Sequence, residues 1–357
     1  MINRKEMEGE IINLTKVWLT VCISLSYCHA VGKFLHPGVG RFLAIAPVIV
    51  LFFLLPLQLT SIHLGGATSF FIAWLANFKL LLFATGDGPP STNPQLPLRQ
   101  FIALSCLPIK ILQNPSEKSS PNNRTEILNE KPKSLINYSI KALIVVLMVK
   151  LYDYSEFIHP KVILFIYSWH IYFLLEIILA ITQFFARNLL GIELEPQFRD
   201  PYYSTSLQDF WGRRWNLMAT NILQPTVYKP TVKIASKVVG RTWAPLPAVM
   251  ATFLVSAMMH ELIFYYLGRM KPNWEITWFF VIHGIALTLE ILMKKVLPQK
   301  RRIPVAVSLP VTLFFIFSTS IWLFFPQFVR LKLDVRAFEE YAALVSFVKK
   351  VAFSLVG

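Results

Sequence analysis

Two stretches of the sequence contain side chains that could transfer a proton or bind a phosphate group. The first, SAMMHELIFYY at 256–266, places His260 and Glu261 inside an otherwise apolar segment. Ionisable groups within a membrane span are costly and usually face a polar cavity or a partner, which makes them functional candidates. A neutral imidazole can take a proton from a hydroxyl group near neutral pH. His260 is therefore the first candidate for a general base.

A buried histidine held by one hydrogen bond to a neighbouring helix would give the same pattern. His170 and His283 also lie within apolar segments, and His283 shares a helical face with Glu290. His260 differs in having a carboxylate next to it. Successive helical residues point about 100° apart. We therefore expect Glu261 to organise the cavity or a facing helix rather than to hold the same imidazole.

The second stretch, YSTSLQDFWGRRWNLMATNILQPTVYKP at 203–230, gathers polar, basic and aromatic residues in a loop between two apolar segments. Trp211 and Trp215 are four residues apart and would share one face of an α-helix. Arg213 and Arg214 carry planar guanidinium groups that suit phosphate oxygens. This stretch therefore favours a ligand that bears phosphate.

An amphipathic helix at the membrane surface is the alternative for the same stretch. Its tryptophans would lie at headgroup depth and its arginines would contact lipid phosphates. Asp209 and Asn216 argue mildly against this alternative, because a simple anchor needs neither a carboxylate nor a carboxamide beside the arginines.

Other kinds of catalytic site find little support in the sequence. A zinc-binding HExxH motif would need a histidine at 264, where Phe264 stands, and no GxSxG motif of a serine hydrolase occurs. Cys22, Cys28 and Cys106 form no CxxC pair and suggest neither a disulfide framework nor a metal site. We expect no metal and no cofactor.

The composition indicates which elements position these residues. Of the 357 residues, 55% are apolar and only 15% are charged, so the chain is expected to be solvated by lipid. The net charge of +15 does not indicate nucleic acid, because the basic residues lie in loops between apolar runs. The first apolar run is expected to be a retained signal anchor rather than a cleaved peptide.

A bilayer core about 30 Å thick needs roughly 20 mostly apolar residues for each helical crossing. On this basis we expect an all-α polytopic membrane protein with about eight or more crossings. The segment at 138–152 is the weakest, because it is short and carries Lys141 and Lys150, which would place it at the interface or tilt it. Segments 98–112 and 342–353 are expected to lie on the surface. The expected crossings are 16–36, 42–60, 68–85, 138–152, 161–185, 246–267, 275–293 and 303–325.

Lysine and arginine are unevenly distributed between alternate loops. The loops at 37–41, 86–137, 187–245 and 294–302 contain 1, 6, 8 and 5 of them, and the loops at 61–67, 153–160 and 268–274 contain 0, 0 and 2. Cytosolic loops of membrane proteins carry the excess of positive charge. The first set, which includes the stretch at 203–230, is therefore expected on the cytosolic side.

Taken together, these stretches resemble the plant wax synthase family of the membrane-bound O-acyltransferase superfamily. SLQDFWGRRWN at 206–216 is similar to its signature loop, and VSAMMHELIFYY at 255–266 is similar to the helix with its catalytic histidine. The runs FFIAWLANFKLLLFATGDGP at 70–89, LEPQFRDPYYSTSLQDFWGRRWNL at 194–217 and WLFFPQ at 322–327 are also similar, so the resemblance covers nearly the whole chain.

The resemblance implies one domain over residues 1–357, with the signature region at about 190–270 and helices around an intramembrane reaction chamber. His260 would be the catalytic histidine and Asn216 the second polar residue of the active site, with Glu261 beside them. The residues expected to bind acyl-CoA are Gln208, Asp209, Phe210, Trp211, Arg213, Arg214 and Trp215.

The implied reaction is the esterification of a long-chain fatty alcohol by acyl-CoA, in the endoplasmic reticulum membrane. Relatives of this pattern acylate sterols or acetylate diacylglycerol, and no residue separates these three acceptors. A non-catalytic lipid transporter is the alternative from a different class. The expected partners are acyl-CoA, a hydrophobic alcohol and the lipid bilayer, with no nucleic acid; acyl-chain length and oligomeric state stay open.

Overall fold

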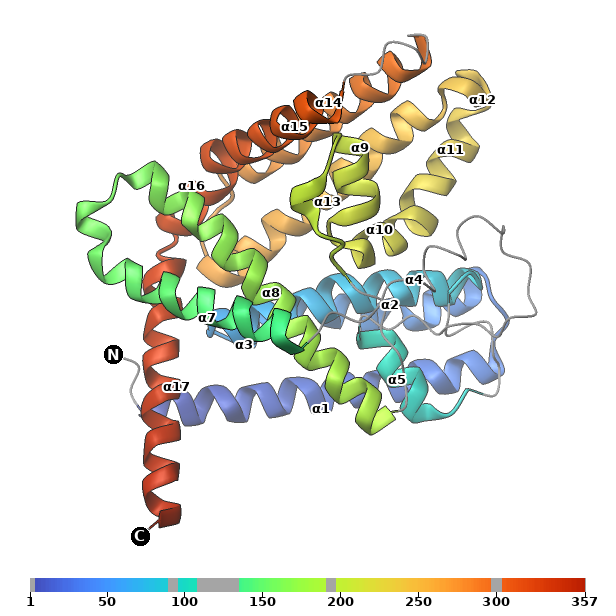
Figure 1. The fold of residues 1–357 in the computed structure, drawn as a ribbon. Helices are drawn as coiled ribbons and strands as arrows, with labels where there is room; N and C mark the ends of the chain where they lie inside the picture. The colour runs from blue at the N-terminus through green and yellow to red at the C-terminus, as the bar shows by residue number, and fades with distance from the viewer. Residues whose placement is uncertain (1–3, 89–95, 108–134, 191–196, 297–303, 357) are drawn as a thin grey trace. The chain divides into compact units, whose positions relative to one another are not determined.

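The computed structural model describes the chain except for residues 1–3, 89–95, 108–134, 191–196, 297–303 and 357. The described residues form helices joined by short turns, and no strand occurs among them (Figure 1). The chain divides into two compact units, residues 109–198 and the remainder.

Among the residues that the structure describes, seven helical segments are long and apolar enough to cross a membrane. They coincide with seven of the eight predicted crossings, which confirms an all-α polytopic membrane protein. The eighth, predicted at 138–152, is a helix, α7 (Leu135–Leu151), that is too short to belong to this set. The seven segments are Glu8–Phe34, Val39–Gln58, Ile62–Thr85, Pro160–Phe184, Gly240–Gly268, Glu275–Val296 and Val305–Arg330.

The smaller unit contains α7 and α8 (Pro160–Leu190), joined by η4 (Tyr152–Phe157). Lys141 of α7 is buried and forms an ion pair with Glu176 of α8 at 2.5 Å. Its charge is therefore paired inside the smaller unit. The Nδ1 atom of His170 lies 3.1 Å from the hydroxyl of Tyr152. His170 is thus a buried histidine held by a hydrogen bond, which is the structural role given above as the alternative to a catalytic one.

In the larger unit, α13 (Pro245–Gly268) and α14 (Glu275–Val296) pack against each other over much of their length (Figure 1). Gly284 of α14 permits this close approach. A Cβ atom at this position would lie 3.0 Å from Cβ of Phe253 and 3.1 Å from Sδ of Met250. A side chain at 284 would therefore push the two helices apart.

Four π-helical segments interrupt the α-helices among the described residues. In a π-helix the backbone N–H bonds to the carbonyl five residues earlier, and such turns often occur at functional sites. They are η2 (Phe70–Ala76), η6 (Phe210–Arg214), η7 (Gln224–Tyr228) and η9 (Ser320–Phe324).

The stretch at 203–230, predicted as a loop, is folded into short helices. Ser206 and Asn216 each precede a helix and accept a hydrogen bond from a free backbone N–H of its first turn. The short helices are η5 (Pro201–Tyr203), α9 (Leu207–Asp209), η6, α10 (Leu217–Leu223), η7 and α11 (Lys229–Ala235). After them, α12 (Gly240–Trp243) leads into α13.

Of the two segments predicted to lie on the surface, the first is packed inside. Residues 98–106 form α5 (Leu98–Cys106), whose Phe101 and Leu104 are buried, and residues 108–112 lie outside the described part. The second belongs to α17 (Leu333–Val356), which runs across the ends of α1 (Arg4–Phe34) and α3 (Ile62–Ser69) (Figure 1).

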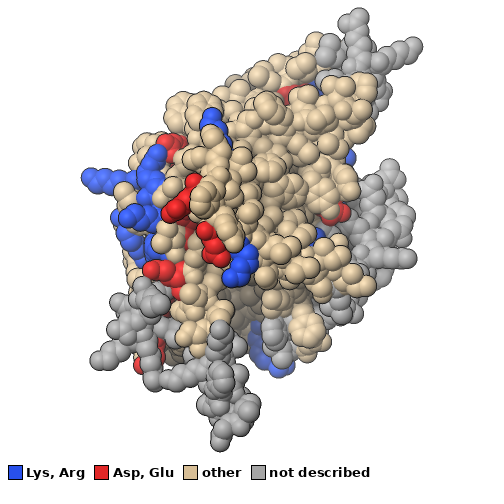
Figure 2. Space-filling view, turned by 60° about the vertical axis from the view of Figure 1, so that its left-hand side comes forward, with Lys and Arg blue, Asp and Glu red and all other residues tan. Residues whose placement is uncertain are grey.

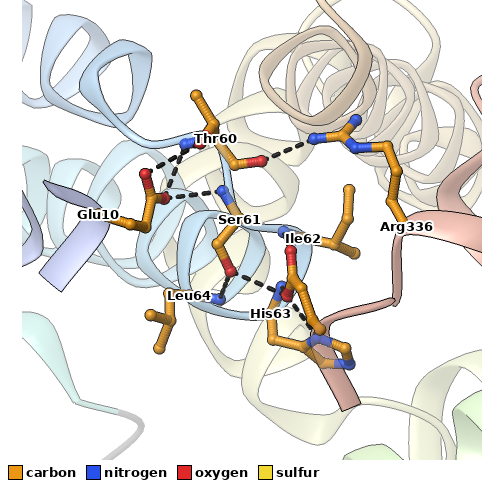
Figure 3. Close-up of polar contacts among 8 residues, drawn as sticks. Glu10, Thr60, Ser61, Ile62, His63, Leu64 and Arg336 are labelled. Carbon is orange, nitrogen blue, oxygen red and sulfur yellow. Dashed lines mark hydrogen bonds and ion pairs between the residues drawn. The ribbon is translucent and has the colours of Figure 1, made fainter. Parts of the chain in front are cut away.

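A polar cluster joins α17 to the start of α3 (Figure 3). The carboxylate of Glu340 accepts hydrogen bonds from the backbone N–H of Ile62 at 2.5 Å and of His63 at 3.0 Å, and from the Ser61 hydroxyl at 2.9 Å. Arg336 donates to the carbonyl oxygen of Thr60 at 2.6 Å. Glu340 therefore supplies acceptors that the first turn of α3 lacks.

Much of the surface in Figure 2 carries no charged side chain, and the charged residues gather on one part of this face. Large apolar side chains are exposed along the candidate spans, among them Leu19, Ile23, Phe314 and Trp322. Apolar patches of this extent are unusual on proteins dissolved in water. The exposed faces suit contact with lipid.

Candidate active site

His260 lies in the second half of α13 and is surrounded by aromatic rings. The centroid of its imidazole is 4.4 Å from that of Phe280 on α14, 5.3 Å from that of Trp74 on η2 and 6.2 Å from that of Phe324 on η9. Two of these rings come from π-helical segments. The residue as a whole is only partly buried.

The hydrogen bond of His260 determines which ring nitrogen can act as a base. Its Nδ1 atom lies 2.8 Å from the carbonyl oxygen of Ser256, one turn earlier in α13. A carbonyl oxygen only accepts hydrogen bonds, so Nδ1 must carry the proton. In the neutral imidazole, Nε2 then has a free lone pair and is the atom that can accept a proton.

Glu261 points to the next helix and not to the imidazole of His260. Its Oε1 atom accepts hydrogen bonds from the backbone N–H of Thr277 at 3.1 Å and from the Thr277 hydroxyl at 3.0 Å. It thus satisfies a free donor in the first turn of α14. These contacts agree with the expectation that Glu261 organises a facing helix; a direct part in catalysis stays a prediction.

The π-helical turn of η6 corrects the predicted pairing of two tryptophans. The backbone N–H of Trp215 donates to the carbonyl of Phe210 at 2.8 Å, five residues earlier. This places Phe210 and Trp215 in a stack with their planes 14° apart. Trp211 turns instead to α13 and α14, where it meets Phe253 edge-on at 5.4 Å. The prediction of a shared α-helical face was wrong because it assumed a turn of 3.6 residues.

His283 fixes the position of Trp211 through a chain of hydrogen bonds. The indole Nε1 donates to Nδ1 of His283 at 3.1 Å, so this nitrogen carries no proton and Nε2 does. Nε2 donates to the Thr319 hydroxyl at 2.8 Å, which donates to the carbonyl of Phe315 at 2.8 Å. His283 is completely buried and links η6 to α14 and α15 (Val305–Thr319).

Glu290, two turns after His283 on α14, holds the short helix α9 in place. Its carboxylate accepts from the backbone N–H groups of Leu207 at 2.8 Å and Gln208 at 3.4 Å. Lys294 donates to Glu290 at 2.6 Å and to the side chain of Gln208 at 3.1 Å. The shared face of His283 and Glu290, visible in the sequence, is therefore the face that carries the signature segment.

The two neighbouring arginines have different surroundings. Nε of Arg214 donates to Asp209 at 2.7 Å, and its NH1 group donates to the carbonyls of Arg199 and Asp200 at 3.2 and 3.3 Å. These contacts close the segment on itself. Arg213 is exposed and has no partner among the described residues, so its guanidinium group is free to bind a phosphate.

Asn216 begins α10 in a left-handed conformation, with φ of 45°. Its Oδ1 atom accepts from the backbone N–H of Ala219 at 3.2 Å and so caps the helix. Asparagine tolerates this conformation better than most residues. No direct hydrogen bond joins Asn216 to His260 among the described residues. Met218, two residues after Asn216, packs in one apolar cluster with Trp74 and Met259.

The structure therefore brings together part of the predicted site. Phe280 contacts both His260 and Trp211, whose ring centroid is 6.0 Å from it. Gln208 contacts Glu290 and Lys294, further along α14 than Phe280. No contact joins Asp209, Arg213 or Arg214 to His260 among the described residues. Trp74, which contacts His260, was not among the predicted site residues, because a tryptophan within an apolar run is indistinguishable from a core residue.

Known proteins resemble this chain over almost its whole length. The model of the membrane bound O-acyl transferase family matches residues 194–282, which contain η6 and His260. The chain is 48% identical to acyl-CoA–sterol O-acyltransferase 1 of Arabidopsis thaliana over 94% of its own length and 96% of that protein. It is 40% identical to the long-chain-alcohol O-fatty-acyltransferase of Simmondsia chinensis over 99% of both chains.

A polytopic membrane protein with a candidate base among apolar helices is suited to acyl transfer to hydrophobic molecules. The chain belongs to the membrane bound O-acyl transferase family, and the resemblance seen in its sequence is confirmed. It is an O-acyltransferase.

Proposed function

We propose that this enzyme transfers the acyl group of acyl-CoA to the hydroxyl group of a long-chain fatty alcohol within the endoplasmic reticulum membrane. The observation that carries the proposal is the hydrogen bond from His260 to the carbonyl of Ser256, which leaves Nε2 as a base in an aromatic environment. A hydrophobic alcohol reaches such a site from the lipid phase.

The reaction proceeds through proton transfer at one atom. Nε2 of His260 takes the proton from the alcohol as its oxygen attacks the thioester carbonyl carbon. The new C–O bond forms, the C–S bond breaks, and the thiolate of CoA takes the proton from Nε2. Asn216 is the second polar residue of the site, and no covalent acyl-enzyme is required.

The arrangement along α14 supports a bound acyl-CoA that extends from the signature segment to His260. Phe280, which contacts His260, and Glu290, which holds α9, are ten residues apart on this helix. At a rise of 1.5 Å per residue they are about 15 Å apart along the axis. The phosphates of CoA would bind at the exposed Arg213, and the arm that carries the sulfur would reach inwards to the imidazole.

A sterol is the second candidate for the acceptor. The 48% identity to a protein named as a sterol acyltransferase supports it, against 40% for one named as acting on a long-chain alcohol. The test uses membranes from cells that lack lipid esters and express this chain. They receive labelled acetyl-, lauroyl- or palmitoyl-CoA with fatty alcohol, sterol or diacylglycerol.

His260→Ala should lower kcat in this assay by about 10²- to 10⁴-fold, the usual contribution of general acid–base catalysis. His36→Ala is the matched control, because His36 is exposed and has no partner among the described residues. A well-folded His260→Ala protein with near-wild-type ester formation would refute the proposed role. Expressed wild-type protein that forms no ester with any donor and acceptor would favour a transporter.

A further inference from the structure

Trp74 carries a buried hydrogen-bond donor that the protein does not use. Its side chain is 2% exposed, and its Nε1 atom has no hydrogen-bond partner within the part of the chain that the structure describes. Native proteins leave few buried polar groups unpaired, and each one calls for an explanation. The indole nitrogen can only donate, so the missing partner is an acceptor.

Trp211 shows what the same fold does with a tryptophan that has a structural role. Its Nε1 donates to His283, a fully buried residue whose other nitrogen is also bonded. Both indoles contact α13, and the described residues supply an acceptor to Trp211 and none to Trp74. This contrast indicates that the partner of Trp74 comes from outside the chain.

The position of the unpaired donor indicates what this partner is. The indole of Trp74 meets the imidazole of His260 edge-on, with ring centroids 5.3 Å apart and planes 71° apart. The two rings are neighbours, so a substrate group bound against the imidazole also lies next to the indole that carries the unpaired N–H. Of the three aromatic rings around His260, those of Phe280 and Phe324 carry no donor.

The reaction proposed above creates an acceptor at this place. When the alcohol oxygen attacks the thioester, the carbonyl oxygen gains negative charge, and a fixed donor aimed at it stabilises the transition state. The donor is most effective where water is excluded. On the basis of the proposed function, we propose that Trp74 is a catalytic residue whose Nε1–H donates a hydrogen bond to the carbonyl oxygen of the acyl-CoA thioester.

The hydrogen bond strengthens as charge develops, so its loss should lower kcat more than it raises KM. Trp74→Phe keeps an aromatic ring but removes the N–H, and kcat should fall by about 10²-fold, the typical effect of removing one such donor. Replacement of Trp74 by benzothienylalanine, which has sulfur in place of the N–H in a ring of similar size, should have the same effect. Trp278→Phe, at an exposed indole on α14, should keep wild-type kcat.

A second measurement observes the hydrogen bond without turnover. A CoA analogue in which a ketone labelled with ¹³C replaces the thioester cannot transfer its acyl group. When it binds to the wild-type enzyme, its carbonyl stretching band should move to lower frequency, and this shift should be lost with either replacement at Trp74. A purely structural indole would leave the band unchanged.

The outcomes distinguish this inference from the function on which it rests. Ester formation by the wild-type enzyme that depends on His260, together with unchanged kcat and an unchanged carbonyl band in the Trp74 variants, would overturn the role of Trp74 alone. A wild-type enzyme that forms no ester would overturn both proposals. A fall in kcat with the loss of the band shift, in variants that keep the wild-type melting temperature, would support it.

Discussion

His260 and His283 lie on the paired helices α13 and α14 but are held in opposite tautomers. The Nδ1–H group of His260 donates a hydrogen bond to a backbone carbonyl, whereas Nδ1 of His283 accepts a hydrogen bond from the indole N–H of Trp211. Both nitrogens of His283 are bonded, whereas Nε2 of His260 is free among the described residues. The hydrogen bonds therefore separate a candidate base from a positioning residue, which the residue type alone could not do.

The neighbouring arginines should respond differently to the same substitution. Arg213→Gln should raise KM for acyl-CoA about tenfold and leave kcat nearly unchanged, because a phosphate contact made equally in ground and transition states affects binding. Arg214→Gln should instead lower the melting temperature, because it removes the contacts to Asp209 and to two carbonyls.

Arg241→Gln provides the control for a general loss of positive charge, since Arg241 is exposed on α12. Equal effects of all three substitutions on KM would indicate non-specific attraction of the negatively charged donor. No change in KM for Arg213→Gln would remove this residue from the CoA site.

At the scale of the elements, the sequence predicts long apolar helices well and their irregular turns poorly. A long apolar run crosses the membrane whatever its detailed packing, so seven crossings were found. The π-helical turns depend on how helices pack, which periodicity does not encode. They stack Phe210 on Trp215, and they place Trp74 and Phe324 beside His260.

Glu261 offers a test of how one helix positions the next. Glu261→Gln keeps a carbonyl oxygen that can accept from Thr277, so ester formation and melting temperature should stay close to the wild type. Glu261→Ala leaves a partly buried backbone N–H at the start of α14 without this acceptor, which should cost about 1 kcal/mol of stability. A large fall in kcat for Glu261→Gln, without loss of stability, would assign the carboxylate a direct catalytic role.

At the scale of the whole molecule, distant parts of the sequence meet at the start of α3. Glu10 accepts from the backbone N–H of Thr60 and Ser61 at 2.7 Å each, and Glu340 accepts from the next two residues. No local pattern predicts such a cluster, because α1, α3 and α17 are far apart in the chain. The sequence therefore predicts the helices, but only the structure shows which distant helices bond to each other.

The Glu340 cluster should make stability depend on pH. Burial alone would raise the pKa of Glu340, but hydrogen bonds from His63, Ile62 and Ser61 outweigh it and lower the pKa below its ordinary value of 4.5. A carboxylate with a depressed folded-state pKa stabilises the fold fully above its unfolded pKa and loses this contribution as the pH falls through the folded value. Melting temperatures in detergent should therefore drop more below pH 4.5 for the wild type than for Glu340→Gln.

Glu340→Gln should also melt at a lower temperature than the wild type at pH 7, since a neutral amide is a weaker acceptor for these N–H groups. Other carboxylates titrate in the same range, so the difference between the two proteins is the quantity to follow. Parallel curves over the whole range would show that Glu340 contributes no pH-dependent stability.

The bond between His260 and Ser256 has a consequence for how the enzyme can diversify. The proton on Nδ1 is held by the main chain of α13, which every residue type provides, and not by a neighbouring side chain. Residues that line the path of the acceptor can therefore mutate without altering the state of the base. Under the proposed function, the hydrogen bond that sets the tautomer of His260 therefore does not depend on the side chains that contact the acceptor, so selection can change these side chains while the base is preserved.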